Sequence, residues 1–364
     1  MMNIVKSNSF SKLCAVRSLL AARSPISCRG IATSPPPLLN QPTARAWLHQ
    51  LATVRGYLQS LEEPSAHVGP IPVEDSIGKE GITRLSANMV THKVFYTDSN
   101  GRDFLKRVWD SREDCPLTVT QPVAGNYYPI NTGIFMDDKK LEFSVLVDRA
   151  TGGSSINDGE IEMMLHRRMI KDDSRGVVEP LDEIVCINNN STCQGLMVRG
   201  KYYVSVDPLG SGARRRRSTG QEIYSPLVLA FSHETRSSSH IVEGSSMASN
   251  YSLPLNVALI TLQEMGYGSV LLRLANLYEA GEDPDYSTLA KVELKKMFAG
   301  KMMTKLRDTS LSANQDKSEM KRMTWQVEGT SHNEPAMSRG APVDASSLVV
   351  ELSPMEIRTF VLNF

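Results

Sequence analysis

Short runs of β-branched and aromatic residues, separated by turn residues, constrain the fold of this chain more than any other feature. Residues 94–97 (Val-Phe-Tyr-Thr) lead into a turn at 98–101 that ends in Asn-Gly, and 143–147 follows a charged turn at 137–140. Asn-Gly after such a run is typical of a β-hairpin. The same pattern predicts strands at 201–206, 227–232, 257–262, 269–274, 348–352 and 358–362. Many short strands between turns indicate an all-β chain with sandwich architecture.

Few stretches favour a helix. The spacing of Trp47, Leu51, Val54 and Leu58 predicts one short helix within residues 42–61. Among the strands, the best helical candidate is 160–169, although its Met-Met-Leu centre would suit a strand as well.

Proline, glycine and serine divide the chain into segments. Residues 64–72, with three Pro and one Gly, are interpreted as a linker, and the Ser- and Gly-rich stretch at 237–250 as a domain boundary. We therefore expect an N-terminal extension over 1–63, a β-domain over 64–245 and a second β-domain over 246–364.

The N-terminal extension differs from the rest in charge. Its first 60 residues contain no Asp or Glu, and they are rich in Arg and Ser. That composition is typical of an organellar transit peptide, which predicts a mostly disordered segment; a tail without function is the alternative. Over the whole chain, 40 Lys and Arg balance 40 Asp and Glu, so no net charge would hold a polyanion. No apolar run is long enough to span a membrane.

The cysteines point to an oxidising compartment. Cys186 and Cys193 enclose a short loop that they could close, and two overlapping Asn-x-Ser/Thr sequons in it start at Asn189 and Asn190. A third sequon starts at Asn250. The 5 cysteines form no Cys-x-x-Cys pair, so no structural zinc site is expected.

A collinear series of motifs resembles glycoside hydrolase family 38, specifically plant α-mannosidases of the vacuolar or lysosomal type. The motifs are GPIPVED at 69–75, FYTDSNGRDF at 95–104, AGNYYPIN at 124–131, LVDRATGGSS at 146–155, HRR at 166–168 leading into DDSRG at 172–176, GQEIYSPL at 220–227, LLRL at 271–274, YEAGED at 278–283 and LSPMEIRTF at 352–360. Together they cover about residues 66–364, whereas 1–63 match nothing in the family.

The resemblance implies a β-supersandwich similar to galactose mutarotase, followed by a smaller C-terminal β-domain. It also implies that the chain is the C-terminal part of an enzyme that hydrolyses α-mannosidic bonds with retention, using a carboxylate nucleophile, a second carboxyl acid/base and a zinc ion. The family's His-x-Asp and His-His-Asp motifs hold that zinc. None of the 7 histidines here lies in such a motif. We expect no catalytic residue, no metal ligand and no cofactor in this chain, and no activity when it is alone.

The resemblance also suggests which residues reach the sugar. In the family an Arg of the His-Arg-Arg motif approaches the sugar site, so Arg168 is the first candidate for substrate binding and Arg167 the second. The alternative is that these arginines pair with Asp172 or Asp173 for stability. Similar plant sequences carry two cysteines around the loop, which implies a Cys186–Cys193 disulfide.

The expected partners are a mannose-containing glycan and a separately encoded catalytic half. The vacuole, lysosome or extracellular space is the expected location, and the mitochondrion is the alternative that the N-terminal composition favours. Two other hypotheses are an autonomous glycosidase that uses Asp172 or Asp173, and a fragment without function. The four arginines at 214–217 stand where the family usually has an aromatic residue, at Arg215; we interpret them as a strand-turn segment and expect no nucleic-acid partner.

Overall fold

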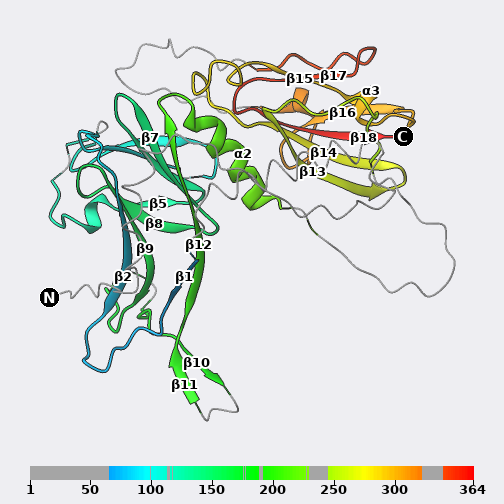
Figure 1. The fold of residues 1–364 in the computed structure, drawn as a ribbon. Coiled ribbons are helices and arrows are strands. Elements are labelled where there is room, and N and C mark those ends of the chain that lie inside the picture. Colours follow the sequence, from blue (N-terminus) through cyan, green and yellow to red (C-terminus); the bar gives the residue numbers. More distant parts are fainter. Residues whose placement is uncertain are drawn as a thin grey trace, which may run out of the picture. The chain divides into compact units, whose positions relative to one another are not determined.

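The computed structural model describes residues 65–98, 100–112, 115–116, 118–174, 176, 178–187, 192–226, 228, 245–321 and 339–364. The expected extension over 1–63 with its helix, the strand expected at 227–232 and the sequon residues Asn189 and Asn190 lie outside this part. The chain divides between Leu209 and Gly210 into two compact units (Figure 1), and each is described by itself.

The first unit is a β-sandwich. Its strands are β1 (Ser65–Val68), β2 (Lys79–Ser86), β3 (Val94–Asp98), β4 (Phe104–Val108), β5 (Tyr128–Ile130), β6 (Gly133–Asp137), β7 (Leu141–Val147), β8 (Thr151–Ser154), β9 (Glu160–Arg168), β10 (Ile184–Ile187), β11 (Thr192–Gly195) and β12 (Val198–Pro208), with a 3-10 helix, η3 (Ala124–Asn126). Within the described residues they form a six-stranded sheet in the order β1-β12-β7-β6-β3-β4, a four-stranded sheet in the order β2-β9-β8-β5, and the hairpin β10-β11.

The core of this unit lies between its two larger sheets. The six-stranded sheet contributes Phe95, Ile134, Met136, Phe143, Val145 and Val147, and the four-stranded sheet contributes Ile130, Ile161 and Met163. Apolar side chains at alternate positions of facing sheets bury one side of each sheet, which is the driving force for a sandwich.

A buried carboxylate holds the turn region next to this core. The side chain of Asp98, at the end of β3, is fully buried. Its Oδ1 accepts hydrogen bonds from the backbone N–H groups of Asn131 (3.0 Å), Thr132 (2.8 Å) and Gly133 (2.9 Å), and Oδ2 accepts one from Gly101 (2.9 Å). The β3-β4 hairpin predicted from the Asn-Gly turn is confirmed, with Val94 opposite Val108.

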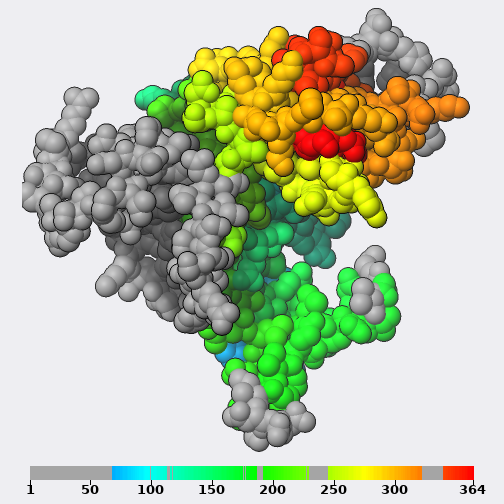
Figure 2. Space-filling view, turned by 90° about the vertical axis from the view of Figure 1, so that its right-hand side faces the viewer, coloured from blue at the N-terminus to red at the C-terminus, as the bar shows by residue number. Residues whose placement is uncertain are grey.

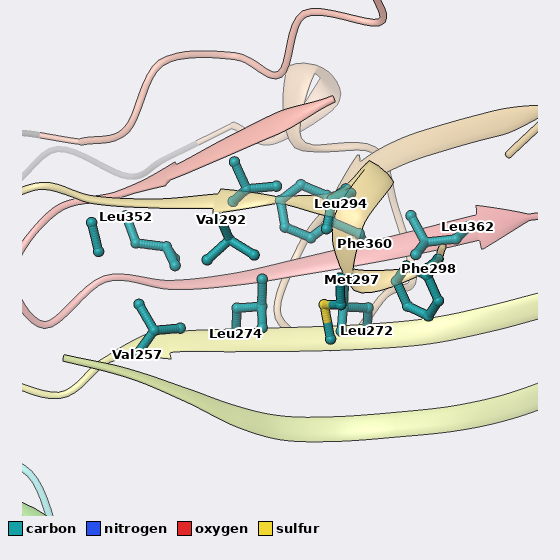
Figure 3. Packing of buried hydrophobic residues seen from close by; sticks show 12 residues of the cluster. Val257, Leu272, Leu274, Val292, Leu294, Met297, Phe298, Leu352, Phe360 and Leu362 are labelled. Carbon is teal, nitrogen blue, oxygen red and sulfur yellow. The ribbon is translucent and has the colours of Figure 1, made fainter. Parts of the chain in front are cut away.

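The second unit is a smaller sandwich that also contains helices. Its elements are α2 (Gly212–Tyr224), β13 (Val257–Gly266), β14 (Ser269–Asn276), β15 (Ala290–Glu293), α3 (Leu294–Met297), β16 (Lys305–Thr309), η4 (Lys317–Glu319), β17 (Val349–Leu352) and β18 (Ile357–Asn363). In the described part, β13-β14-β18-β16 form one sheet and β15-β17 another. Leu272, Leu274, Phe360 and Leu362 of the first sheet pack with Val292, Val350 and Leu352 of the second (Figure 3).

Three predicted elements differ from the structure. Residues 160–168, the helical candidate, form strand β9, because Ile161 and Met163 alternate into the core while Glu160 and Glu162 face the other side. Within the expected linker, Ser65–Val68 is strand β1, which pairs with β12. Residues 214–217 belong to helix α2, not to a strand and turn.

Helix α2 also explains where the two units divide. Arg214 and Arg217, three positions apart and so on one helix face, bind Asp283 and Glu282 of the second unit. These ion pairs attach α2 to the loop between β14 and β15, so the helix belongs to the compact unit that begins at Gly210. The domain limits expected from the sequence, 64–245 and 246–364, stay predictions.

Candidate functional site

The two candidate arginines lie at the C-terminal end of β9. This strand pairs with β2, and the register places Arg168 opposite Lys79 and Arg167 opposite Glu80. Neighbouring residues of a strand project from opposite faces of the sheet. Arg167 is therefore on the outer face, with Glu162 and Arg84, and Arg168 is on the inner face, beyond the end of the hydrophobic core.

Arg167 is an accessible side chain with a stabilising partner. Its Nη2 lies 3.0 Å from Oε1 of Glu80, and 45% of the Arg167 side chain is exposed. An exposed cross-strand ion pair of this kind contributes about 0–1 kcal/mol. The sequence suggested Asp172 or Asp173 as the stabilising partner of this arginine. In the structure the ion-pair partner of Arg167 is Glu80. Asp172 accepts a hydrogen bond from the Ser174 backbone N–H (2.7 Å), in a local turn.

Arg168 is held at one end of its guanidinium group. Nη1 donates a hydrogen bond to the backbone oxygen of Ile71 at 2.9 Å. Nε is buried and has no acceptor in the part of the chain that the structure describes. A buried donor without an acceptor costs about 1–3 kcal/mol, more when it is charged. Arg168 therefore keeps one charged N–H group unsatisfied inside the described part of the fold, while the residue as a whole is partly exposed.

A loop forms one wall around Arg168. Lys79, which is 7% exposed, donates from Nζ to the backbone oxygen of Pro72 (2.6 Å) and pairs with Oδ2 of Asp75 (2.8 Å). The hydrogen bond from Lys79 lowers the pKa of the Asp75 carboxyl below its ordinary value. The loop after β1 thus supplies Asp75, whose carboxylate balances the charge of Lys79. It also supplies the backbone oxygen of Ile71, which accepts the hydrogen bond from Arg168.

The hairpin β10-β11 forms the other wall. Cys186 and Cys193 are directly opposite each other in its register and are joined by a disulfide bond. Two residues further along β11, Gly195 is buried against the Arg168 guanidinium, and the backbone oxygen of Leu196 accepts a hydrogen bond from Nε2 of His166 at 3.0 Å. In Figure 1 this hairpin lies next to the start of β12 and extends away from the two larger sheets of the unit, and Figure 2 shows the same unit turned by 90°.

A second polar cluster lies on the outer face of the same sheet and was not predicted from the sequence. The carboxylate of Glu162, 4% exposed, accepts hydrogen bonds from Arg84 Nε (3.1 Å), Arg84 Nη2 and the Tyr127 hydroxyl. Burial, and next the bond to Glu162, raise the pKa of the Tyr127 phenol, and the bond to Glu162 raises the pKa of Arg84. These groups satisfy one another, so the cluster stabilises the sheet and offers no free acid or base.

Comparison with known proteins identifies a protein family for a segment of each unit. The glycosyl hydrolases family 38 C-terminal domain matches residues 63–175, and the family 38 C-terminal beta sandwich domain matches residues 256–360. The chain carries the C-terminal domains of glycosyl hydrolase family 38. The first of these family 38 segments contains β9 and both arginines.

Curated relatives of these domains are α-mannosidases. An α-mannosidase from Canavalia ensiformis is 63% identical over 300 residues, which cover 82% of this chain and 31% of the relative. Lysosomal α-mannosidases from Bos taurus and Homo sapiens are 39% and 38% identical, and each match covers 87% of this chain and 31% of the relative. The chain thus spans about a third of the length of these relatives.

Three further observations concern the family 38 domains as a whole. The part of the chain that the structure describes contains no group of three or more His, Cys, Asp and Glu that could hold a metal ion. In that part, no helix is both long and apolar enough to cross a membrane. Asn250, the one sequon residue that the structure describes, is exposed and lies between the two matched segments.

Proposed function

We propose that this chain is the C-terminal part of an α-mannosidase that acts on mannose-containing glycans together with a separately encoded catalytic half. The family 38 matches and the α-mannosidase relatives support this role. The observation that carries it is Arg168, whose guanidinium is held at one end by the Ile71 oxygen while the residue as a whole stays partly exposed. A guanidinium N–H is a strong donor to a sugar hydroxyl or to an active-site carboxylate.

Under this proposal Arg168 contacts the sugar and Arg167 is the second candidate. The nucleophile, the acid/base and the zinc of the family reaction belong to the catalytic half. The described residues do not fit a zinc ion, so no step of the proposal passes through one. The role of this chain is to bind the glycan and to orient it, and it is inactive when alone.

The experiment combines this chain with the portion of the Canavalia ensiformis α-mannosidase that the match does not cover. We expect the mixture to hydrolyse an aryl α-mannoside and neither partner to do so alone. Replacing Arg168→Lys should lower kcat/KM of the mixture by about a hundredfold, the usual effect of removing one donor to a reacting group. Arg199→Lys, an exposed arginine on β12 of the same unit, is the control. A mixture without activity, or activity that is insensitive to Arg168→Lys, would contradict the proposal.

An assay of the chain without any partner tests the competing hypothesis, an autonomous glycosidase. That hypothesis requires turnover by the chain alone, and the turnover should disappear with Asp172→Asn or Asp173→Asn.

We also propose the vacuole, lysosome or extracellular space as the location, supported by the lysosomal relatives and by the disulfide. A mitochondrial location, the alternative from the N-terminal composition, would leave the cysteines reduced.

A further inference from the structure

Any side chain at position 195 would collide with the Arg168 guanidinium in the place where the structure has it. A Cβ atom added to Gly195 would lie 2.7 Å from Nη1, 3.1 Å from Cζ and 3.5 Å from Nε of Arg168. Contacts under 3.0 Å essentially never occur at real Cβ atoms. Because the atoms concerned are the far end of a flexible side chain, the fold could tolerate a larger residue, but the guanidinium would have to move.

The strand that carries Gly195 depends on the disulfide. Within the described residues β10 and β11 form a sheet of only two strands, and Ile184 and Val185 of β10 are 57% and 46% exposed. An isolated two-stranded hairpin is at best marginally stable in water. The Cys186–Cys193 bond joins the two strands two residues before Gly195 and so keeps β11 in place.

A second contact fixes the other end of β11. The Leu196 backbone oxygen accepts the hydrogen bond from His166, and Gly69 lies close enough that an added Cβ would be 2.5 Å from this oxygen. The φ angle of +117° at Gly69 also favours glycine there. The hairpin is thus attached to β9 on one side and to the loop after β1 on the other.

We propose that Gly195 is a positioning residue for Arg168, and that the disulfide-closed hairpin holds it against the guanidinium so that this group meets an oxygen atom of the mannoside in a fixed orientation. The identity of that acceptor rests on the proposed function; the positioning itself does not. With Nη1 fixed on the Ile71 oxygen and Gly195 packed against the group, the guanidinium has one orientation. A side chain that is oriented before binding loses less entropy when it binds.

The positioning is tested by NMR of the whole chain with ¹⁵N-labelled arginine. The Nε–H resonance of Arg168, assigned by its loss in Arg168→Lys, should be protected from exchange with water because the atom is buried. In Gly195→Ala and in the double variant Cys186→Ala/Cys193→Ala this resonance should shift and lose protection. Gly200→Ala is the matched control, since its Cβ would have no neighbour closer than 3.6 Å. An unchanged Arg168 resonance in Gly195→Ala overturns the inference.

A double-mutant cycle in the mixture with the catalytic half tests the consequence for the reaction. Gly195→Ala should lower kcat/KM by roughly ten- to a hundredfold, as for a displaced catalytic contact, and should have no further effect in the Arg168→Lys background. Equal effects in both backgrounds would mean a merely structural role and would overturn the inference. If Gly195→Ala shifts the Arg168 resonance but Arg168→Lys leaves turnover unchanged, the proposed function fails while the positioning stands.

Discussion

Arg214 and Asp283 are joined by two hydrogen bonds, from Nε to Oδ2 at 2.6 Å and from Nη2 to Oδ1 at 3.2 Å. The same carboxylate accepts the backbone N–H groups of Asp285 (2.8 Å) and Tyr286 (3.0 Å). Its side chain is fully buried. One carboxylate therefore fixes both the start of helix α2 and the loop before β15.

Replacing Asp283→Ala should destabilise the second unit. The substitution removes four hydrogen bonds and leaves backbone donors of Asp285 and Tyr286 without their acceptor. A loss of about 1–3 kcal/mol in the free energy of unfolding is expected from such donors. Calorimetry or denaturant unfolding measures it. Asp285→Ala is the control, because that side chain is 69% exposed, and an equal loss there would contradict the special role of Asp283.

Acid should weaken the same contact. Burial by itself would raise the pKa of Asp283, but the hydrogen bonds from Arg214 and from the two backbone amides outweigh it, so the pKa lies below its ordinary value of 3.8. A carboxyl group with a depressed folded-state pKa stabilises the fold above its unfolded pKa, and this contribution is lost as the pH falls through the folded pKa. The difference in Tm between the native chain and Asp283→Asn should therefore be constant above about pH 5 and shrink below about pH 4. A difference that grows in acid would refute this.

Replacing Gly153→Ala should destabilise the first unit. An added Cβ would lie 2.4 Å from Cδ1 of Ile130 and 2.8 Å from the Glu162 backbone oxygen, in a packed sheet. Such overpacking costs about 1–3 kcal/mol. Thermal unfolding should show the loss in Gly153→Ala and little change in Gly200→Ala, where the nearest atoms would be in ordinary contact. Equal stabilities of the two variants would show that β8 and β5 can separate without penalty.

Mass spectrometry of unreduced protein from the native source should find Cys186 linked to Cys193. It should also find glycan on Asn250, which is exposed, and on Asn189 or Asn190 of the sequon loop. Both modifications require passage through the secretory pathway. Free thiols together with unmodified asparagines would favour the mitochondrial alternative.

Much of the strand layout could be predicted from local sequence. The runs at 94–97, 143–147, 201–206 and 257–262 are confirmed as parts of β3, β7, β12 and β13, because β-branched and aromatic residues between turns have few other stable arrangements. The runs at 269–274, 348–352 and 358–362 lie at β14, β17 and β18. Strand β9 was harder, since its apolar residues at 161 and 163–165 fit a helix and a strand equally well.

Contacts between distant residues could not be predicted from that local pattern. Helix α2 contains four consecutive arginines that look like a solvated run, and the carboxylate partners of Arg214 and Arg217 lie more than 60 residues away. Arg84 and Glu162 are 78 residues apart and meet only because β2 pairs with β9. The motif at 166–168 identified the arginines, but the hairpin glycine beside Arg168 becomes visible only once β11 is placed.

The register of β9 contains one irregularity, since Gly81 is opposite His166 and Ile82 is opposite Met164, which leaves Leu165 without a partner. This bulge decides which arginine occupies which side of the sheet. Up to Met164 the even-numbered residues of β9 face outward, and after the extra residue the odd-numbered ones do. If β9 continued regularly past Met164, Leu165 would lie opposite Gly81 and Arg167 opposite Lys79, so Arg167 instead of Arg168 would occupy the inward position beneath the hairpin. One unpaired residue thus sorts two chemically identical neighbours into two different environments.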